Sequence, residues 1–137
     1  MKFLSESLNN KVLGDIFNGF VIFEDFLVEK VYGEFHTLIK TSLQKKYPFF
    51  EDINGGEGIV WKLIAKEVGE VLFIDEVSIL YDDSGDDRLS IKNYKRLCPI
   101  FKKDIKILGD KYFKVDKIYF FKAYLKKVYY CIRKSLS

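Results

Sequence analysis

The sequence is poor in the residues that build metal sites and covalent cross-links. It contains two cysteines, Cys98 and Cys131, with no Cys-x-x-Cys pair, and a single histidine. Ordinary zinc sites need clustered cysteines and histidines, so this scarcity excludes them. The two cysteines lie far apart in the chain, which argues for a reducing, cytoplasmic setting.

Long apolar runs are also missing. No stretch reaches the ~18 consecutive apolar residues that a membrane-spanning helix needs. The N-terminal residues Met1 to Glu6 include no long apolar run, so we expect no signal peptide. The paired acids Asp82-Asp83 and Asp86-Asp87 lack the spaced ligands of a calcium loop, and we expect them to form a solvated turn.

Bulky apolar residues, by contrast, are abundant. Hydrophobic residues make up 48% of the 137 positions and aromatic residues 17%. This composition is sufficient for a real core and excludes bulk disorder. The length fits one compact domain or a part of a larger one.

Charge is divided unevenly along the chain. Residues 1–91 contain 9 Lys and Arg against 17 Asp and Glu, whereas residues 92–137 contain 14 against 3, so the net charges are −8 and +11. A basic tail after an acidic body suggests an anionic partner: a nucleic acid, an acidic membrane surface or the acidic body itself. Solubility and self-complementary packing explain the same asymmetry equally well.

Hydrophobic periodicity predicts a mixed fold. Helical spacing of apolar residues covers residues 3–18, and a β-branched, aromatic run predicts a strand near 20–24 with a short helix or turn up to Gly33. A short strand and a turn into Pro48 follow. From Glu57 the apolar residues fall on one face of a helix that Gly69 ends: Val60, Trp61, Ile64, Ala65 and Val68.

The second half of the chain continues this mixture. Two apolar runs near residues 71–74 and 77–81 read as strands, and helices are predicted from residue 91 to Gly109 and over 115–134. The last helix is apolar over a wide arc and basic on the remainder. We therefore expect an α/β or α+β fold with a few short strands and three to four helices, the longest at the C-terminus.

An ordered series of motifs runs through residues 40–90. It comprises an aromatic-proline turn, a loop acid, an acid at a helix start, an aromatic residue four positions later, an Ile-Ala pair, two strand ends and an acidic loop: Tyr47-Pro48-Phe49, Glu51, Glu57, Trp61, Ile64-Ala65, Phe73-Ile74-Asp75-Glu76, Leu80-Tyr81 and Asp87-Arg88-Leu89-Ser90. In order and spacing this series resembles the C-terminal, acceptor-side portion of family 2 glycosyltransferases, which have the GT-A fold. The resemblance implies that residues 1–91 are the acceptor-side part of a GT-A-like domain and that residues 92–137 are a basic, aromatic helical tail packed on it.

The resemblance implies a catalytic role for Glu57. In the family an acid at this helix start is the general base that deprotonates the acceptor hydroxyl while the sugar leaves a nucleotide diphosphate with inversion. The chemistry is reasonable here, because backbone N–H groups at a helix N-terminus hold a carboxylate and the Gly55-Gly56 pair allows close approach of the backbone. A plain N-terminal helix acid is the alternative interpretation. The residues expected to bind substrate are Glu51, Asp52, Trp61, Arg88 and Ser90, although its place on the apolar face favours a core role for Trp61 over a sugar platform.

The family's nucleotide-binding half has no counterpart in this sequence. That half begins with a Rossmann-like unit and ends with an Asp-x-Asp motif that binds the metal and the donor diphosphate. The first 39 residues are too few for such a unit, and no Asp-x-Asp precedes Glu57. We therefore expect no metal or cofactor in this chain, a Mg²⁺ or Mn²⁺ in the missing half, and no sugar transfer by this chain alone.

The expected partners follow from the resemblance and from the charge. They are a complementary nucleotide-sugar-binding half or a second copy of the chain, a glycan or lipid-linked acceptor, and an anionic membrane surface; the expected location is the cytoplasm or the inner face of the membrane. The alternative function is a small α+β protein-binding module, immunity-like or regulatory, whose acidic body and basic tail engage a charged partner. Nucleic-acid binding ranks third, because no recognition motif accompanies the basic helices.

Overall fold

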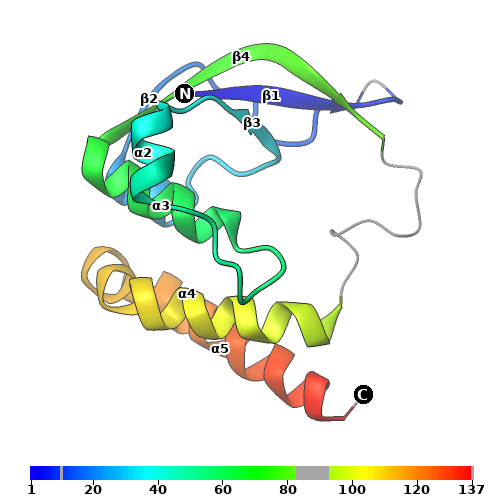
Figure 1. Cartoon of the computed structure of the whole chain (residues 1–137), viewed down its shortest axis with the longest axis vertical. Coiled ribbons are helices and arrows are strands. Elements are labelled where there is room, and N and C mark those ends of the chain that lie inside the picture. Colours follow the sequence, from blue (N-terminus) through cyan, green and yellow to red (C-terminus); the bar gives the residue numbers. More distant parts are fainter. Residues whose placement is uncertain (10, 83–92, 137) are drawn as a thin grey trace. The chain divides into compact units, whose positions relative to one another are not determined.

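The computed structural model describes residues 1–9, 11–82 and 93–136 (Figure 1). Its elements in chain order are β1 (Lys2–Ser7), β2 (Gly19–Ile22), α1 (Phe23–Leu27), β3 (Phe35–Thr37), α2 (Thr41–Lys46), α3 (Glu57–Val68), β4 (Glu70–Tyr81), α4 (Tyr94–Val115) and α5 (Lys117–Ser135). The predicted mixed α+β class is confirmed. Within the described ranges there are five helices rather than three to four, because the short helices α1 and α2 join the three long ones.

The chain divides into two compact units. One comprises Met1–Pro48 and Lys62–Arg88, and the other comprises Phe49–Trp61 and Leu89–Ser137. The loop before α3 and the first residues of α3 thus belong with the C-terminal helices. The organisation expected from the sequence, with a boundary at residue 91, stays a prediction.

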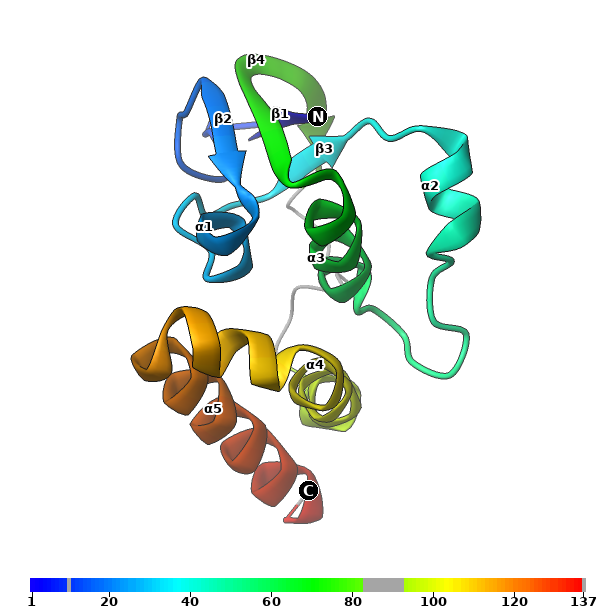
Figure 2. The ribbon, with the colours of Figure 1, turned by 90° about the vertical axis from the view of Figure 1, so that its left-hand side faces the viewer.

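The first unit is built on a four-stranded mixed sheet with the strand order β2-β4-β1-β3 (Figure 2). Strand β4 pairs parallel with β1 and antiparallel with β2, and β3 pairs antiparallel with β1. The two apolar runs expected as separate strands are one strand of 12 residues, β4. Its exposed Asp75 and Glu76 lie inside the strand without ending it, because strand pairing on both sides holds the backbone.

The helix predicted over residues 3–18 is wrong. Residues Lys2–Ser7 form β1, in the middle of the sheet between β4 and β3. Four of its six residues are buried, so it does not show the alternation by which a half-exposed strand is recognised. Further along, a Cβ on Gly14 would lie 2.7 Å from the Cα of Gly33, so the backbone contact between these two residues requires glycine.

Two smaller expectations also need correction. The turn predicted before Pro48 contains a helix, α2, at Thr41–Lys46. Helix α4 does not end at Gly109 but continues to Val115, and it contains Pro99. Gly109 is buried, and a Cβ there would make ordinary contacts with Ile105 and Phe120, so its small size serves packing rather than termination.

An aromatic cluster forms the core of the sheet unit. Phe73 on β4 is 1% exposed, and its ring centroid lies 5.0 Å from that of Phe35, 6.1 Å from Phe17 and 6.2 Å from Phe26. Lys2 lies beside this cluster, donates a hydrogen bond of 3.1 Å to the Thr37 hydroxyl, and places its ammonium 5.5 Å from the Phe26 ring centre. Burial lowers the pKa of Lys2 to about 8.

The two long helices of the second unit form an antiparallel hairpin (Figures 1 and 2). One residue, Asp116, separates them: its backbone N–H donates to the Tyr112 carbonyl at the end of α4, and its carboxylate accepts from the Tyr119 N–H at the start of α5. Ring contacts line the hairpin, including a stacked pair of Phe101 and Tyr130 with centroids 5.0 Å apart. A short link with a capping side chain favours antiparallel neighbours.

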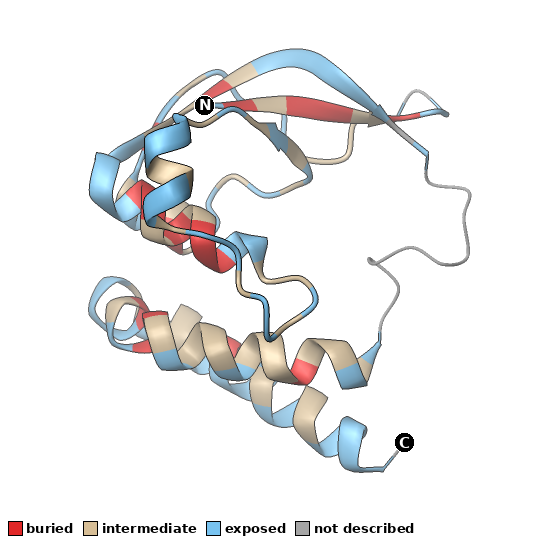
Figure 3. Cartoon of the chain, in the orientation of Figure 1, coloured by how far each residue is buried: buried red, intermediate tan, exposed pale blue. Residues whose placement is uncertain are grey.

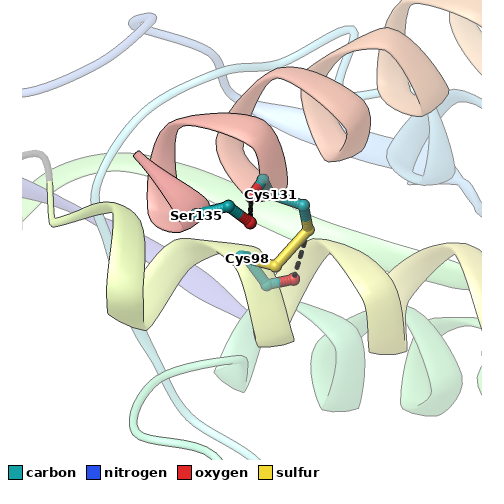
Figure 4. Close-up of a disulfide and its surroundings, with 3 residues drawn as sticks. All are labelled: Cys98, Cys131 and Ser135. Atoms are coloured by element: carbon teal, nitrogen blue, oxygen red, sulfur yellow. Dashed lines mark hydrogen bonds between the residues drawn. A yellow bond between two sulfur atoms is a disulfide. The ribbon is translucent and has the colours of Figure 1, made fainter. Parts of the chain in front are cut away.

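A disulfide joins the two helices (Figure 4). Cys98 on α4 and Cys131 on α5 are bonded across a sequence separation of 33, with their Cα atoms 4.9 Å apart. Ser135 donates a hydrogen bond of 3.1 Å to the Cys131 carbonyl one turn earlier. The sequence separation of the two cysteines therefore misled the argument for a reducing setting, because folding brings them together.

The absence of long apolar runs has its structural counterpart. Among the helices of the described residues, none combines the length and the apolar character needed to cross a membrane.

Candidate functional site

Glu57, the candidate base, is the first residue of α3. The N-cap position therefore falls on Gly56, which has no side chain to accept a hydrogen bond from the helix N-terminus. The Glu57 side chain is exposed, and within the described part of the chain no hydrogen bond or ion pair joins its carboxylate to another residue. It is thus an accessible carboxylate at the positive end of a helix rather than a cap.

The glycine pair in front of Glu57 has a backbone conformation that other residues rarely adopt. Gly55 and Gly56 have φ angles of +94° and +96°. A Cβ on Gly55 would lie 3.0 Å from Ile100 Cδ1, 3.1 Å from Arg96 Nη1 and 4.0 Å from Glu57 Oε2. Arg96 and Glu57 therefore approach the same point beside the Gly55 backbone, with a cation and an anion on either side of it.

Helix α4 holds the loop that leads into α3. Lys103 forms an ion pair with Asp52, and its ammonium lies 4.1 Å from the centre of the Phe50 ring. The hydrogen bond from Lys103 holds the pKa of Asp52 below its ordinary value. Lys103 thus holds one end of the loop and Arg96 and Ile100 lie against the other, so the backbone before Glu57 is supported from α4 (Figure 1).

The aromatic candidate Trp61 lies one turn into α3. It is neither buried nor exposed, and its ring meets that of Phe49 edge to face, with centroids 5.4 Å apart. The core positions of this helix are instead Ile59, Val60, Ile64 and Ala65. The predicted apolar face is therefore shifted by one residue toward Ile59, and Trp61 lies at its edge, where one side of the indole contacts solvent.

The second half of α3 is anchored within the sheet unit. Lys62 is buried and forms an ion pair of 2.7 Å with Glu29. Glu67 accepts hydrogen bonds from Lys46, at 2.9 Å, and from the Tyr47 hydroxyl, at 2.6 Å, and these bonds lower its pKa. The tyrosine of the aromatic-proline turn therefore ties the end of α2 to α3.

The predicted substrate residues do not all converge. Glu51 and Asp52 lie in the supported loop, both exposed, and Asp52 is engaged by Lys103. Arg88 and Ser90 lie outside the described residues. In the ranges that the structure describes, no cluster of three or more His, Cys, Asp or Glu residues is arranged to hold a metal ion.

Sequence reasoning missed the two basic residues of this site. Arg96 and Lys103 are among the 14 basic residues of the C-terminal segment, and no local pattern distinguishes them from the others. Their spacing of seven residues, which places two side chains on one face of a helix, was the available indication. The site comprises an exposed carboxylate, a nearby guanidinium, a half-exposed indole and a rigid glycine turn, an arrangement that suits a polyhydroxylated ligand better than a metal ion.

Comparison of the chain with models of known protein families, with curated proteins and with solved structures gives no match.

Proposed function

We propose that this chain is the acceptor-binding portion of a family 2 glycosyltransferase and that Glu57 is its general base. In this proposal Glu57 takes the proton of an acceptor hydroxyl as that oxygen attacks the anomeric carbon of a nucleotide-linked sugar. The nucleotide diphosphate leaves from the opposite face of the sugar, which inverts the configuration. The donor and its divalent metal bind outside these residues, so the chain alone transfers no sugar.

The exposed carboxylate of Glu57 at the start of α3 is the observation that carries the proposal. A general base must reach the proton that it removes, and Glu57 points no hydrogen-bond acceptor into a competing ion pair among the described residues. The Gly55-Gly56 turn leaves the backbone beside it bare of side chains. The aliphatic and aromatic surface of Trp61 and Phe49 supplies a face on which a sugar ring can stack.

Arg96 adds an electrostatic argument. Its guanidinium lies near the Glu57 carboxylate, on the other side of the Gly55 backbone. A nearby cation favours the ionised form of a carboxylate, and it also offers hydrogen bonds to acceptor hydroxyls or to a phosphate of a lipid-linked acceptor. The proposal therefore assigns Arg96 to acceptor binding, in addition to Glu51, Asp52 and Trp61.

The cytoplasmic face of a membrane is the proposed place of action. Disulfides are typical of oxidising compartments. In the cytoplasm the thiol pool would keep Cys98 and Cys131 reduced, and α4 and α5 would then be held together by the ring contacts along the hairpin.

Trp61 provides a direct test of acceptor binding, because it is the only tryptophan in the chain. Titration with a panel of oligosaccharides and polyprenyl-phosphate-linked sugars should change its fluorescence saturably for at least one acceptor. The same ligand should give no change with Trp61→Phe, and Glu76→Gln, an exposed acid on β4, should leave the affinity unchanged. Calorimetry with sugar nucleotides and Mn²⁺ should show no binding.

Two results would oppose the proposal in different ways. Metal-dependent binding of a sugar nucleotide would place a donor site within these residues. Failure of the whole acceptor panel, together with tight capture of an acidic protein, would favour the protein-binding module.

A further inference from the structure

Helix α5 has two apolar faces, and only one of them contacts α4. The face toward α4 carries Phe120, Ala123, Tyr130 and the disulfide-bonded Cys131. Ala123 is the one residue of α5 that is buried. The hairpin therefore accounts for half of the apolar surface of this helix and leaves the rest without a described partner.

The second apolar face, called here the outer face of α5, is exposed (Figure 3). The exposed fraction is 68% at Ile118, 57% at Phe121 and 65% at Leu125. Successive members are spaced three or four residues apart, which places them in one stripe along the helix. The residues of the outer face are Ile118, Phe121, Leu125, Val128, Tyr129 and Ile132.

Basic residues border this stripe and acidic residues are absent from the helix. The sequence of α5 contains six Lys and Arg and no Asp or Glu. Lys122 and Lys126, one turn apart, are exposed and follow the edge of the outer face next to Tyr129. Their aliphatic stems can lie along apolar surface while the ammonium groups extend to anions at its boundary.

We propose that the outer face of α5 docks on an anionic phospholipid bilayer, with the helix lying in the plane of the interface. An exposed apolar stripe of bulky residues with a basic border is the pattern of an interfacial helix. The border attracts anionic headgroups, and the stripe enters the boundary between headgroups and acyl chains. This inference is independent of the proposed sugar transfer, because it uses only the exposure and the charge of α5.

Charge argues against a second copy of the chain as the occupant. Two outer faces brought together would oppose six positive charges to six, with no acid on either helix to pair with them. An acidic protein surface, including the acidic residues of this chain's own sheet unit, satisfies the charges. It does not by itself call for an uninterrupted stripe of aromatic and aliphatic side chains, because charge-rich interfaces are polar at their rims and mixed at their centres.

Co-sedimentation of the full chain with vesicles tests the proposal. The chain should sediment with vesicles of phosphatidylcholine mixed with phosphatidylglycerol and stay in solution with phosphatidylcholine alone. Raising the ionic strength from about 0.05 M to about 0.5 M should weaken the binding at least ~10-fold, because the Debye length shortens. Leu125→Glu should weaken it by a similar factor, since it places a charge in the middle of the stripe.

The matched control is Leu80→Glu. Leu80, on β4, is 62% exposed, so this variant makes the same chemical change at a similarly exposed leucine and alters the net charge equally. It should bind vesicles like the wild type. Equal loss of binding in both variants, or no sedimentation of the wild type at low salt, would overturn the proposal. So would a lowered urea midpoint for Leu125→Glu alone in a chain that does not bind vesicles, because this result would mean that protein covers the stripe.

Discussion

Replacing Glu57 with glutamine should lower kcat for sugar transfer by about 10²–10⁴-fold in a complex of this chain with its donor-binding half, because the amide cannot accept the acceptor proton. The complex would be obtained by co-expression with the product of an adjoining reading frame that carries Asp-x-Asp. Glu57 is exposed, so the variant should lose no more than about 1 kcal/mol of stability from the weakened helix-dipole interaction. Transfer of a radiolabelled sugar and urea unfolding measure the two effects.

Two further variants separate proton transfer from binding. Glu51→Gln, in the loop before α3, should raise KM for the acceptor with little change in kcat, because Glu51 is expected to contact the acceptor and not its reacting oxygen. Glu76→Gln on β4 should change neither parameter, since its side chain is exposed within the sheet unit. Unchanged turnover in Glu57→Gln would mean that this acid serves only the start of α3.

Removal of the disulfide should lower the free energy of unfolding by about 3–4 kcal/mol, the value that chain entropy gives for a closed loop of this length. The bond joins Cys98 and Cys131 over a sequence separation of 33, so its loss frees a long loop in the unfolded chain. The variant Cys98→Ala/Cys131→Ala is preferable to serine at the buried position, because a hydroxyl there would need a new partner. Urea denaturation followed by circular dichroism measures the change.

Dithiothreitol provides the internal control for this experiment. It should lower the urea midpoint of the wild-type chain and leave that of the double-alanine variant unchanged. Equal midpoints for the oxidised and reduced wild type would contradict the stabilising role of the bond. A chain that also retains its helical content after reduction would indicate that the ring contacts between α4 and α5 suffice for the hairpin.

The parts of the fold that depend on local pattern were predictable. Helix α3 was expected from Glu57 to Gly69 and extends over Glu57–Val68, because its apolar spacing, its glycine stop and its acidic start all lie within a short window. Strand β1 was not predictable in this way. It pairs Lys2 with Phe73, some 70 residues later, and its burial on both faces removes the alternation that marks a strand.

The candidate site shows the same division between local and distant information. Glu57 and the glycine turn were found because they are adjacent in sequence, whereas the ion pair of Asp52 and Lys103 spans 51 residues. Charge pairs between distant segments leave no trace in the pattern of one sequence. The disulfide was missed for the same reason, since only the packing of α4 on α5 brings Cys98 to Cys131.

Backbone amide mapping of acceptor binding tests the central claim most directly. In ¹H–¹⁵N spectra of the full chain, titration with an acceptor found in the fluorescence assay should shift the amide resonances of Gly55, Gly56, Glu57 and Gly58 together with the indole N–H of Trp61. The amides of β2 and β3 should stay in place, because these strands lie in the sheet unit. Shifts confined to the sheet, or to α5 alone, with the glycine turn unmoved would contradict an acceptor site at the start of α3.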